Sequence, residues 1–216
     1  MESAPRLSAL PPVNLPNQIT IARLALAVLL FVLLETICRG SGGSAWYFAF
    51  GVYMAAVLSD SLDGYIARSR GQTTAFGRIA DPFADKIVIC GVLVLAQNIE
   101  QTRDLVPSWI VLLVLAREFL VTGLRSYLES RGTVFGANWE GKTKLVVQAV
   151  YCGAILFYPG HRMEWVRSIA ILALYATAAI CLYSAFTYSR KAHAILATSA
   201  AEPAPALRGP PDPDGS

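Results

Sequence analysis

Four aspartates between residues 60 and 85 are the side chains of this sequence best placed to do chemistry. Asp60 and Asp63 are three positions apart, and Asp81 and Asp85 are four apart, so each pair shares one face of a helix. Each pair lies at the end of a long apolar run, and an aspartate at the centre of a membrane helix costs roughly 2.5–3.5 kcal/mol. Carboxylates without a nearby histidine or cysteine suit hard cations. The pattern therefore predicts two Mg²⁺ or Mn²⁺ ions in a clamp suited to phosphoryl chemistry.

Two helices joined by a short polar turn must position these pairs. The turn is formed by residues 68–72, which read Arg-Ser-Arg-Gly-Gln. A connection this short makes the two helices antiparallel neighbours, so both carboxylate faces can meet at one membrane depth. The alternative is a buried ion-pair network of the aspartates with Arg68, Arg78 and Lys86, but four acids exceed what those cations need for pairing.

The same stretch resembles a known family. Eight of its 26 positions match the signature of the CDP-alcohol phosphotransferases without a departure: Asp60, Asp63, Gly64, Ala67, Arg68, Gly77, Asp81 and Asp85. The resemblance implies a membrane enzyme that moves a phosphatidyl or similar group from a CDP-linked donor to an alcohol and releases CMP. It further implies that Asp60, Asp63 and Asp81 are metal ligands. Asp85 is then the candidate base for the acceptor hydroxyl and a further metal ligand.

The composition is that of a membrane protein. Hydrophobic residues make up 55% of the 216 residues and charged residues only 15%, whereas a soluble domain carries about 25% charged residues. The net charge of +3 gives little support for a nucleic-acid partner. The four cysteines are scattered without a CxxC pair, so we interpret them as small apolar residues.

Six apolar runs predict an all-α integral membrane protein with six transmembrane helices. They cover about residues 21–37, 46–67, 81–98, 107–129, 145–158 and 165–188. The start of the third run is open: Asp81 and Pro82 can cap a helix there, or Pro82 can lie inside a helix that began earlier. We expect residues 15–192 to form the catalytic domain. The Pro-rich segments 1–14 and 193–216 are expected to be disordered tails.

The charges between the runs predict the orientation. Six spans place both termini on one side, and most of the cations fall on that side: Arg68, Arg70, Arg78, Arg131, Lys142, Lys144, Arg190 and Lys191. The opposite loops carry Arg39, Arg103 and Arg162. The positive-inside rule then places the termini and the aspartates at the cytoplasmic face of the membrane.

A second set of charges predicts the acceptor. Arg117 and Arg125 are eight positions apart and share a helical face, and Lys142 and Lys144 open the fifth run from the same side. Cations that converge near the metals suit an acceptor that itself carries a phosphate, and Glu118 can orient Arg117 by pairing. The alternative for the two lysines is anchoring at lipid headgroups.

Further motifs narrow the resemblance to one bacterial branch of the family, over residues 14–190. They are Asn17-x2-Thr20-x2-Arg23, Ala116-Arg117-Glu118, Leu124-Arg125 and Gly141-Lys142-x-Lys144, with Leu145 as the one departure, where a threonine is expected. This branch transfers phosphatidyl from CDP-diacylglycerol to glycerol 3-phosphate. By resemblance, the donor site contains Asn17, Thr20, Gly64, Arg68, Thr74 and Gly77. The resemblance also implies that the acceptor phosphate meets Arg117, Arg125, Lys142 and Lys144, and that the enzyme is a homodimer in the bacterial inner membrane.

Two other classes of function remain open. Family members that use inositol phosphate, phosphatidylglycerol or serine share the same metal motif, and the second set of cations argues mainly against serine. A small cation transporter could use the four aspartates as an ion path, but a pore should place acids through the whole membrane depth. Gly64 and Gly77 also have an alternative role, which is close packing of helices.

Overall fold

The computed structural model describes residues 15–40, 43–70, 75–130 and 139–201, and for parts of the helices it describes the backbone alone. Every regular element in these ranges is an α-helix, which confirms the predicted all-α fold. The helices are α1 (Leu15–Cys38), α2 (Ser44–Arg70), α3 (Ala75–Ala96), α4 (Ser108–Ser130), α5 (Trp139–His161) and α6 (Glu164–Ala201).

The helix boundaries decide several points that the sequence left open. Because α3 begins at Ala75, Pro82 lies inside a helix that started earlier and does not mark its first turn. Because α5 begins at Trp139, Lys142 and Lys144 belong to its first turns. The helix α6 continues to Ala201, past the domain boundary predicted at residue 192. Residues 1–14 and 202–216 lie outside the described part of the chain.

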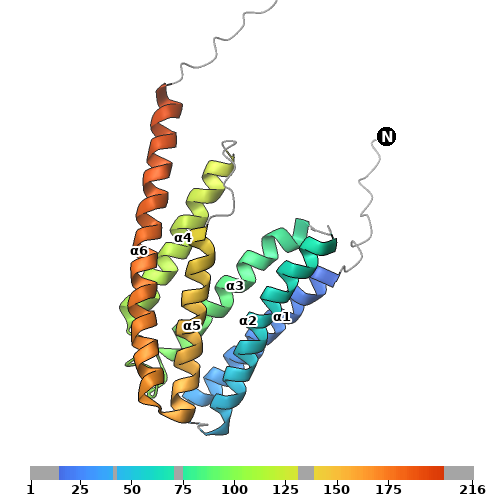
Figure 1. The fold of residues 1–216 in the computed structure, drawn as a ribbon, viewed down its shortest axis with the longest axis vertical. Coiled ribbons are helices and arrows are strands. Elements are labelled where there is room, and N and C mark those ends of the chain that lie inside the picture. Colours follow the sequence, from blue (N-terminus) through green and yellow to red (C-terminus); the bar gives the residue numbers. More distant parts are fainter. Residues whose placement is uncertain (1–14, 41–42, 71–74, 131–138, 202–216) are drawn as a thin grey trace, which may run out of the picture.

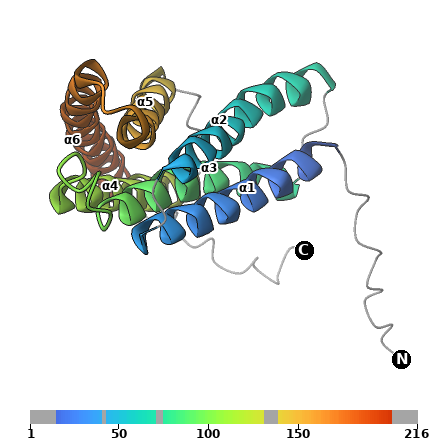
Figure 2. The same cartoon turned by 90° about the horizontal axis from the view of Figure 1, so that it is seen from below.

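The six helices form two groups of three that share one end. Helix α1 packs on both α2 and α3, α5 packs on both α2 and α6, and α4 packs on α6. Figures 1 and 2 show α1–α3 on one side and α4–α6 on the other, close together at one end and diverging toward the other. The first residues of α1 and the last residues of α6 both lie toward the diverging end (Figure 1).

Side chains from several helices fill the shared end. The largest apolar ones with no more than 1% exposure are Leu30, Leu34, Tyr53, Leu93, Ile99, Ile110, Tyr151, Ile155 and Leu156. Two tyrosine hydroxyls donate hydrogen bonds to backbone carbonyls of other segments. Tyr53 on α2 donates to the carbonyl of Ala149 on α5 at 2.8 Å, and Tyr151 on α5 donates to the carbonyl of Leu105 at 2.6 Å. A buried hydroxyl needs such a partner, so these bonds fix how α5 sits against its neighbours.

The turn after α1 requires a glycine. Gly40 has φ +106°, in the region that residues with a side chain rarely adopt, and its N–H donates to the carbonyl of Ile37 at 3.0 Å. A left-handed residue just past a helix end satisfies carbonyls of the last turn and reverses the chain. The turn therefore returns the chain along α1 as α2.

Candidate active site

The predicted metal ligands lie on two antiparallel helix segments. Asp60 and Asp63 belong to the second half of α2, and Asp81 and Asp85 to the first half of α3. Figure 1 shows both halves toward the diverging end of the molecule. The side chains of the four aspartates lie outside the described residues, so the two-metal site stays a prediction.

The predicted donor-site residues belong to neighbouring segments of the same helices. Asn17 and Thr20 lie in the first turns of α1, Gly64 and Arg68 in the last turns of α2, and Gly77 in the first turn of α3. Their side-chain positions lie outside the described residues, as does Thr74 altogether. The helix order therefore brings these segments toward one end of the molecule, and the contacts of their side chains stay predicted.

A described cluster of buried polar side chains joins α4, α5 and α6. Arg117 Nη1 donates to Glu118 Oε1 at 3.0 Å, and Lys144 Nζ contacts the same Oε1. Arg117 Nε and Nη2 both donate to Ser184 Oγ, at 3.2 and 2.6 Å. All four residues are less than 10% exposed. One carboxylate therefore pairs with two cations, and α6 holds the arginine by a serine hydroxyl.

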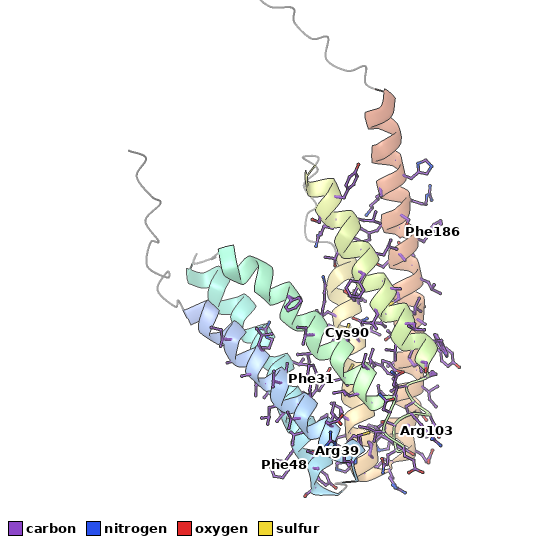
Figure 3. All side chains as sticks on the ribbon, turned by 180° about the vertical axis from the view of Figure 1, so that it is seen from behind. Phe31, Arg39, Phe48, Cys90, Arg103 and Phe186 are labelled. Atoms are coloured by element: carbon purple, nitrogen blue, oxygen red, sulfur yellow. The ribbon has the colours of Figure 1, made fainter. Side chains whose placement is uncertain are left out.

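A cavity lies next to this cluster, between α3, α4 and α5. Its volume is about 130 Å³. Its polar lining residues are Lys86, Glu118, Lys144 and Gln148, and apolar side chains complete the wall. Lys86 Nζ donates to Thr122 Oγ1 on α4 at 2.6 Å, and Gln148 Nε2 faces Cys181 Sγ on α6 at 3.9 Å. Figure 3 labels Cys90, another lining residue, in the middle of the molecule.

The charges of this cluster do not balance. The buried Arg117 and Lys144 and the half-buried Lys86 of the adjoining cavity carry three positive charges. Glu118 is the only carboxylate among the described side chains that line the cavity or pair with the cluster. Removing charges from water costs several kcal/mol per ion unless partners compensate. Glu118 compensates for part of this cost, and an excess of positive charge remains on the described side chains. Such a site favours an anion.

The structure brings together two of the four predicted acceptor residues. Arg117 and Lys144 meet at Glu118. The pairing of Arg117 with Glu118 was predicted from the sequence, and the contact of Lys144 with Glu118 was not. Arg125 is partly buried and lies about 12 Å further along α4, at 1.5 Å per residue. Lys142 lies on α5, and its side chain is outside the described residues.

Four polar residues in the cluster or next to it were absent from the predicted site: Lys86, Thr122, Gln148 and Ser184. Gln148 and Ser184 are single polar residues inside apolar stretches of α5 and α6, and both are no more than 2% exposed. An isolated amide or hydroxyl in an apolar helix is a signal of a buried polar contact. That signal was available from the sequence, although the partners were not.

A second, larger pocket is apolar. It has a volume of about 540 Å³ and lies between α2, α3, α5 and α6. Most of its lining is hydrophobic, including Tyr53, Val88, Phe157 and Ile169. The one charged residue in its lining is Arg23 of α1, which is 1% exposed. A pocket of this size and lining, with one cation, suits a ligand with a large apolar part and an anionic group.

Two helices are long and apolar enough to cross a membrane, judged by length and composition over the described residues. They are the segments Ile21–Cys38 of α1 and Glu164–Ala194 of α6, with mean hydropathies of 2.3 and 2.0. Shorter apolar segments occur at Ser44–Ser59 and Lys86–Ala96. Charged residues such as Arg117, Glu118 and Lys144 reduce the hydropathy of α4 and α5.

The fold and the buried charged cluster define an all-helical protein that keeps a polar site within an apolar bundle. A sequence profile of the CDP-alcohol phosphatidyltransferases matches residues 13–197. The chain belongs to this family and is therefore a transferase. This membership confirms the resemblance of residues 60–85.

Curated relatives agree with the family assignment. The chain is 33% identical over 196 residues to the CDP-diacylglycerol–glycerol-3-phosphate 3-phosphatidyltransferase of Bacillus subtilis, covering 86% of this chain and 98% of the relative. It is 31% identical over 180 residues to the Rickettsia bellii protein of the same name, covering 81% and 93%. It is 39% identical over 140 residues to a probable phosphatidylglycerophosphate synthase of Mycobacterium tuberculosis, covering 65% and 64%.

Proposed function

We propose that this protein transfers the phosphatidyl group of CDP-diacylglycerol to sn-glycerol 3-phosphate, giving phosphatidylglycerophosphate and CMP. Family membership and the names of the relatives support the reaction class. The identity of the acceptor is supported by the buried cluster of Arg117, Lys144 and Glu118. The excess positive charge of this cluster suits an acceptor that carries a phosphate. Inositol is uncharged and serine is zwitterionic, so neither acceptor would compensate for that positive charge.

The donor requires a site with an apolar and a polar part. The apolar pocket of about 540 Å³, with Arg23 as its charged lining residue, supports a place for part of the diacylglycerol. We place the cytidine and diphosphate near Asn17, Thr20, Gly64, Arg68, Thr74 and Gly77. Arg68 lies one turn after Gly64 on α2, from which a guanidinium can reach a diphosphate with its planar fork.

The donor set of the aspartates fits two divalent ions. Asp60, Asp63, Asp81 and Asp85 offer only carboxylate oxygens, on two helix segments that run antiparallel, which suits Mg²⁺ or Mn²⁺. When bound, the ions supply positive charge for the diphosphate and for the CMP that leaves. Asp85 accepts the proton of the acceptor hydroxyl. The freed oxygen forms a bond to the phosphorus that carries diacylglycerol, and that phosphorus loses its bond to the CMP oxygen.

The proposed setting is the bacterial cytoplasmic membrane, with six spans, both termini in the cytoplasm and a homodimeric assembly. The apolar α1 and α6 support membrane insertion. Figure 3 shows Arg39 and Arg103 at the end opposite the start of α1. The larger set of cations, predicted from the sequence for the side of the termini, belongs to the other end, where the helix segments with the aspartates lie. This charge difference supports a cytoplasmic active site.

A direct test measures CMP release by the purified protein in detergent with Mg²⁺ and CDP-diacylglycerol. Glycerol 3-phosphate, inositol phosphate, phosphatidylglycerol and serine are supplied in turn. We expect release with glycerol 3-phosphate alone. We also expect it to be lost on chelation with EDTA, to return with Mg²⁺ or Mn²⁺, and to fall at least about a hundredfold in Asp85→Asn, since general-base catalysis contributes 10²–10⁴-fold.

The other outcomes decide between the alternatives. Release with another acceptor would identify a phosphatidylinositol-phosphate synthase, a cardiolipin synthase or a phosphatidylserine synthase. The cluster of Arg117, Lys144 and Glu118 would then need a role other than binding glycerol 3-phosphate. No release with any acceptor, from a folded protein loaded with metal, would contradict the transferase proposal. Metal-ion flux into proteoliposomes would then test the transporter.

A further inference from the structure

The cavity beside the charged cluster has a cation on each of two opposing helices. Lys86 reaches it from α3 and Lys144 from α5, and Glu118 of α4 lines it between them. The Oε1 atom of Glu118 is engaged with Arg117 and Lys144. Lys86 has a different partner, the neutral hydroxyl of Thr122 at 2.6 Å, and no described carboxylate lies within ion-pair distance of its ammonium.

The net charge around the cavity selects the kind of anion. Lys86, Lys144 and Glu118 line the cavity, and Arg117 pairs with Glu118 from outside the lining, so these four described side chains together carry a net charge of +2. A phosphate monoester carries between −1.5 and −2 at pH 7, because its second pKa is about 6. A phosphodiester such as that of phosphatidylglycerol carries one charge and would leave one cation uncompensated. The combined charge of the cavity lining and of Arg117 behind it therefore matches a phosphate monoester.

The size and position of the cavity agree with this ligand. One water needs only about 10–15 Å³ of cavity volume, so about 130 Å³ has room for a group of several heavy atoms. Gln148 adds an amide that can donate to a phosphate oxygen. Lys86 directly follows Asp85 on α3, so a phosphate at Lys86 keeps the rest of a small acceptor close to the stretch that carries the proposed base.

We propose that Lys86 binds the phosphate of the acceptor opposite Lys144, and that this pair of lysines across the cavity makes the enzyme specific for a phosphate monoester. The inference rests on the proposed function. It adds a residue from the metal-binding helix to the acceptor site, which the spacing of Arg117, Arg125, Lys142 and Lys144 did not indicate.

Three variants separate phosphate binding from a structural role of Lys86. Lys86→Met removes both the charge and the hydrogen bond to Thr122. Thr122→Val removes the same hydrogen bond and leaves the charge. Lys86→Arg keeps the charge. We expect Lys86→Met to raise the KM for glycerol 3-phosphate by about ten- to a hundredfold, the size of a lost charge-assisted hydrogen bond, with a smaller change in kcat.

The KM for CDP-diacylglycerol should stay within about twofold in Lys86→Met, since the cavity faces the acceptor. Thr122→Val should keep the KM for glycerol 3-phosphate, and Lys86→Arg should recover most of the loss. Thermal unfolding with added glycerol 3-phosphate gives a readout without turnover: the ligand should raise the Tm of the wild-type protein and of Thr122→Val, but not that of Lys86→Met.

The failures of the two proposals are distinguishable. If the wild-type protein releases CMP with glycerol 3-phosphate and Lys86→Met keeps the wild-type KM and Tm shift, only the role of Lys86 is overturned. If Thr122→Val and Lys86→Met raise KM equally, the interhelical hydrogen bond is responsible, and the inference is also overturned. If the wild-type protein is inactive with every phosphate monoester and its Tm does not respond to them, both proposals fall.

Discussion

Glu118 shows how a single residue can hold a buried charged site together. Its Oε1 faces Arg117 Nη1 at 3.0 Å and also contacts Lys144 Nζ, and each side chain is nearly enclosed. Glu118→Gln keeps the shape and removes the charge, which leaves two buried cations facing a neutral amide. We expect a loss of about 3–5 kcal/mol of stability, the usual cost of breaking a buried pair. Thermal unfolding of the purified protein measures it.

The matched control is an exposed ion pair in the same chain. Arg39 Nη2 lies 3.1 Å from Glu35 Oε1 on the surface of the α1 end, with both side chains largely exposed. Glu35→Gln should change the stability by less than about 1 kcal/mol, because solvent screens such pairs. Equal effects of the two substitutions would show that Glu118 does not compensate for the buried cations.

At this scale the sequence predicted one contact of the cluster, between Arg117 and Glu118, and not the others. The type and spacing of Arg117, Glu118 and Lys144 were enough to expect an anion site, because charges inside apolar runs need a functional reason. The other partner of Arg117 could not be predicted, since Ser184 is 67 residues away and no local spacing relates them. Lys86 was interpreted only as a possible counterion of the aspartates, because its distance to Lys144 depends on how α3 and α5 pack.

At the scale of helices, the packing of α1 on α3 depends on a residue without a side chain. A Cβ at Gly91 of α3 would overlap the end of the Phe31 ring of α1, in the last third of both helices. Gly91→Ala should therefore push the ring aside and lower the stability by about 1–3 kcal/mol, the usual cost of overpacking. Thermal unfolding checks this, and Phe31→Leu in the same chain should recover part of the loss.

Gly123 of α4 offers the control for this substitution. A Cβ there meets no atom within 4 Å, so Gly123→Ala should be neutral or gain up to about 1 kcal/mol from helix propensity. If Gly91→Ala is as stable as Gly123→Ala, the contact of α1 with α3 is looser than the structure shows.

The sequence predicted all six helices but not all of their ends. Apolar runs mark where a helix is buried, and polar turns of a helix carry no such mark. The helix α5 begins at Trp139 and α3 at Ala75, both ahead of their apolar runs, because polar residues there continue the helix. Pro82 was ambiguous for the same reason: its effect depends on whether a helix precedes it.

At the scale of the whole molecule, successive helices run in opposite directions, so the connections between them are divided between two ends that carry different numbers of cations. Three connections, α1 to α2, α3 to α4 and α5 to α6, lie at the end where the two groups of helices meet (Figure 1). Their cations are Arg39, Arg103 and Arg162. The described part of the opposite end includes the last turns of α6, with Arg190 stacked over Phe186 at 5.7 Å and Lys191 over Tyr188 at 5.6 Å. Membrane insertion should follow this bias, with the more cationic end in the cytoplasm.

Cysteine labelling tests this orientation, because the chain has a suitable thiol at the less cationic end. Cys38 is exposed at the end of α1, whereas Cys152 and Cys181 are buried and Cys90 is partly buried. A membrane-impermeant maleimide added to spheroplasts should label Cys38 and give no signal in Cys38→Ser. In that background Ser189→Cys, exposed on the last part of α6, should react only after permeabilisation.

The reverse labelling pattern would place the termini outside the cell, away from the nucleotide donor. Labelling of both sites in spheroplasts would mean that α1 and α6 do not end on opposite sides, which contradicts six spans.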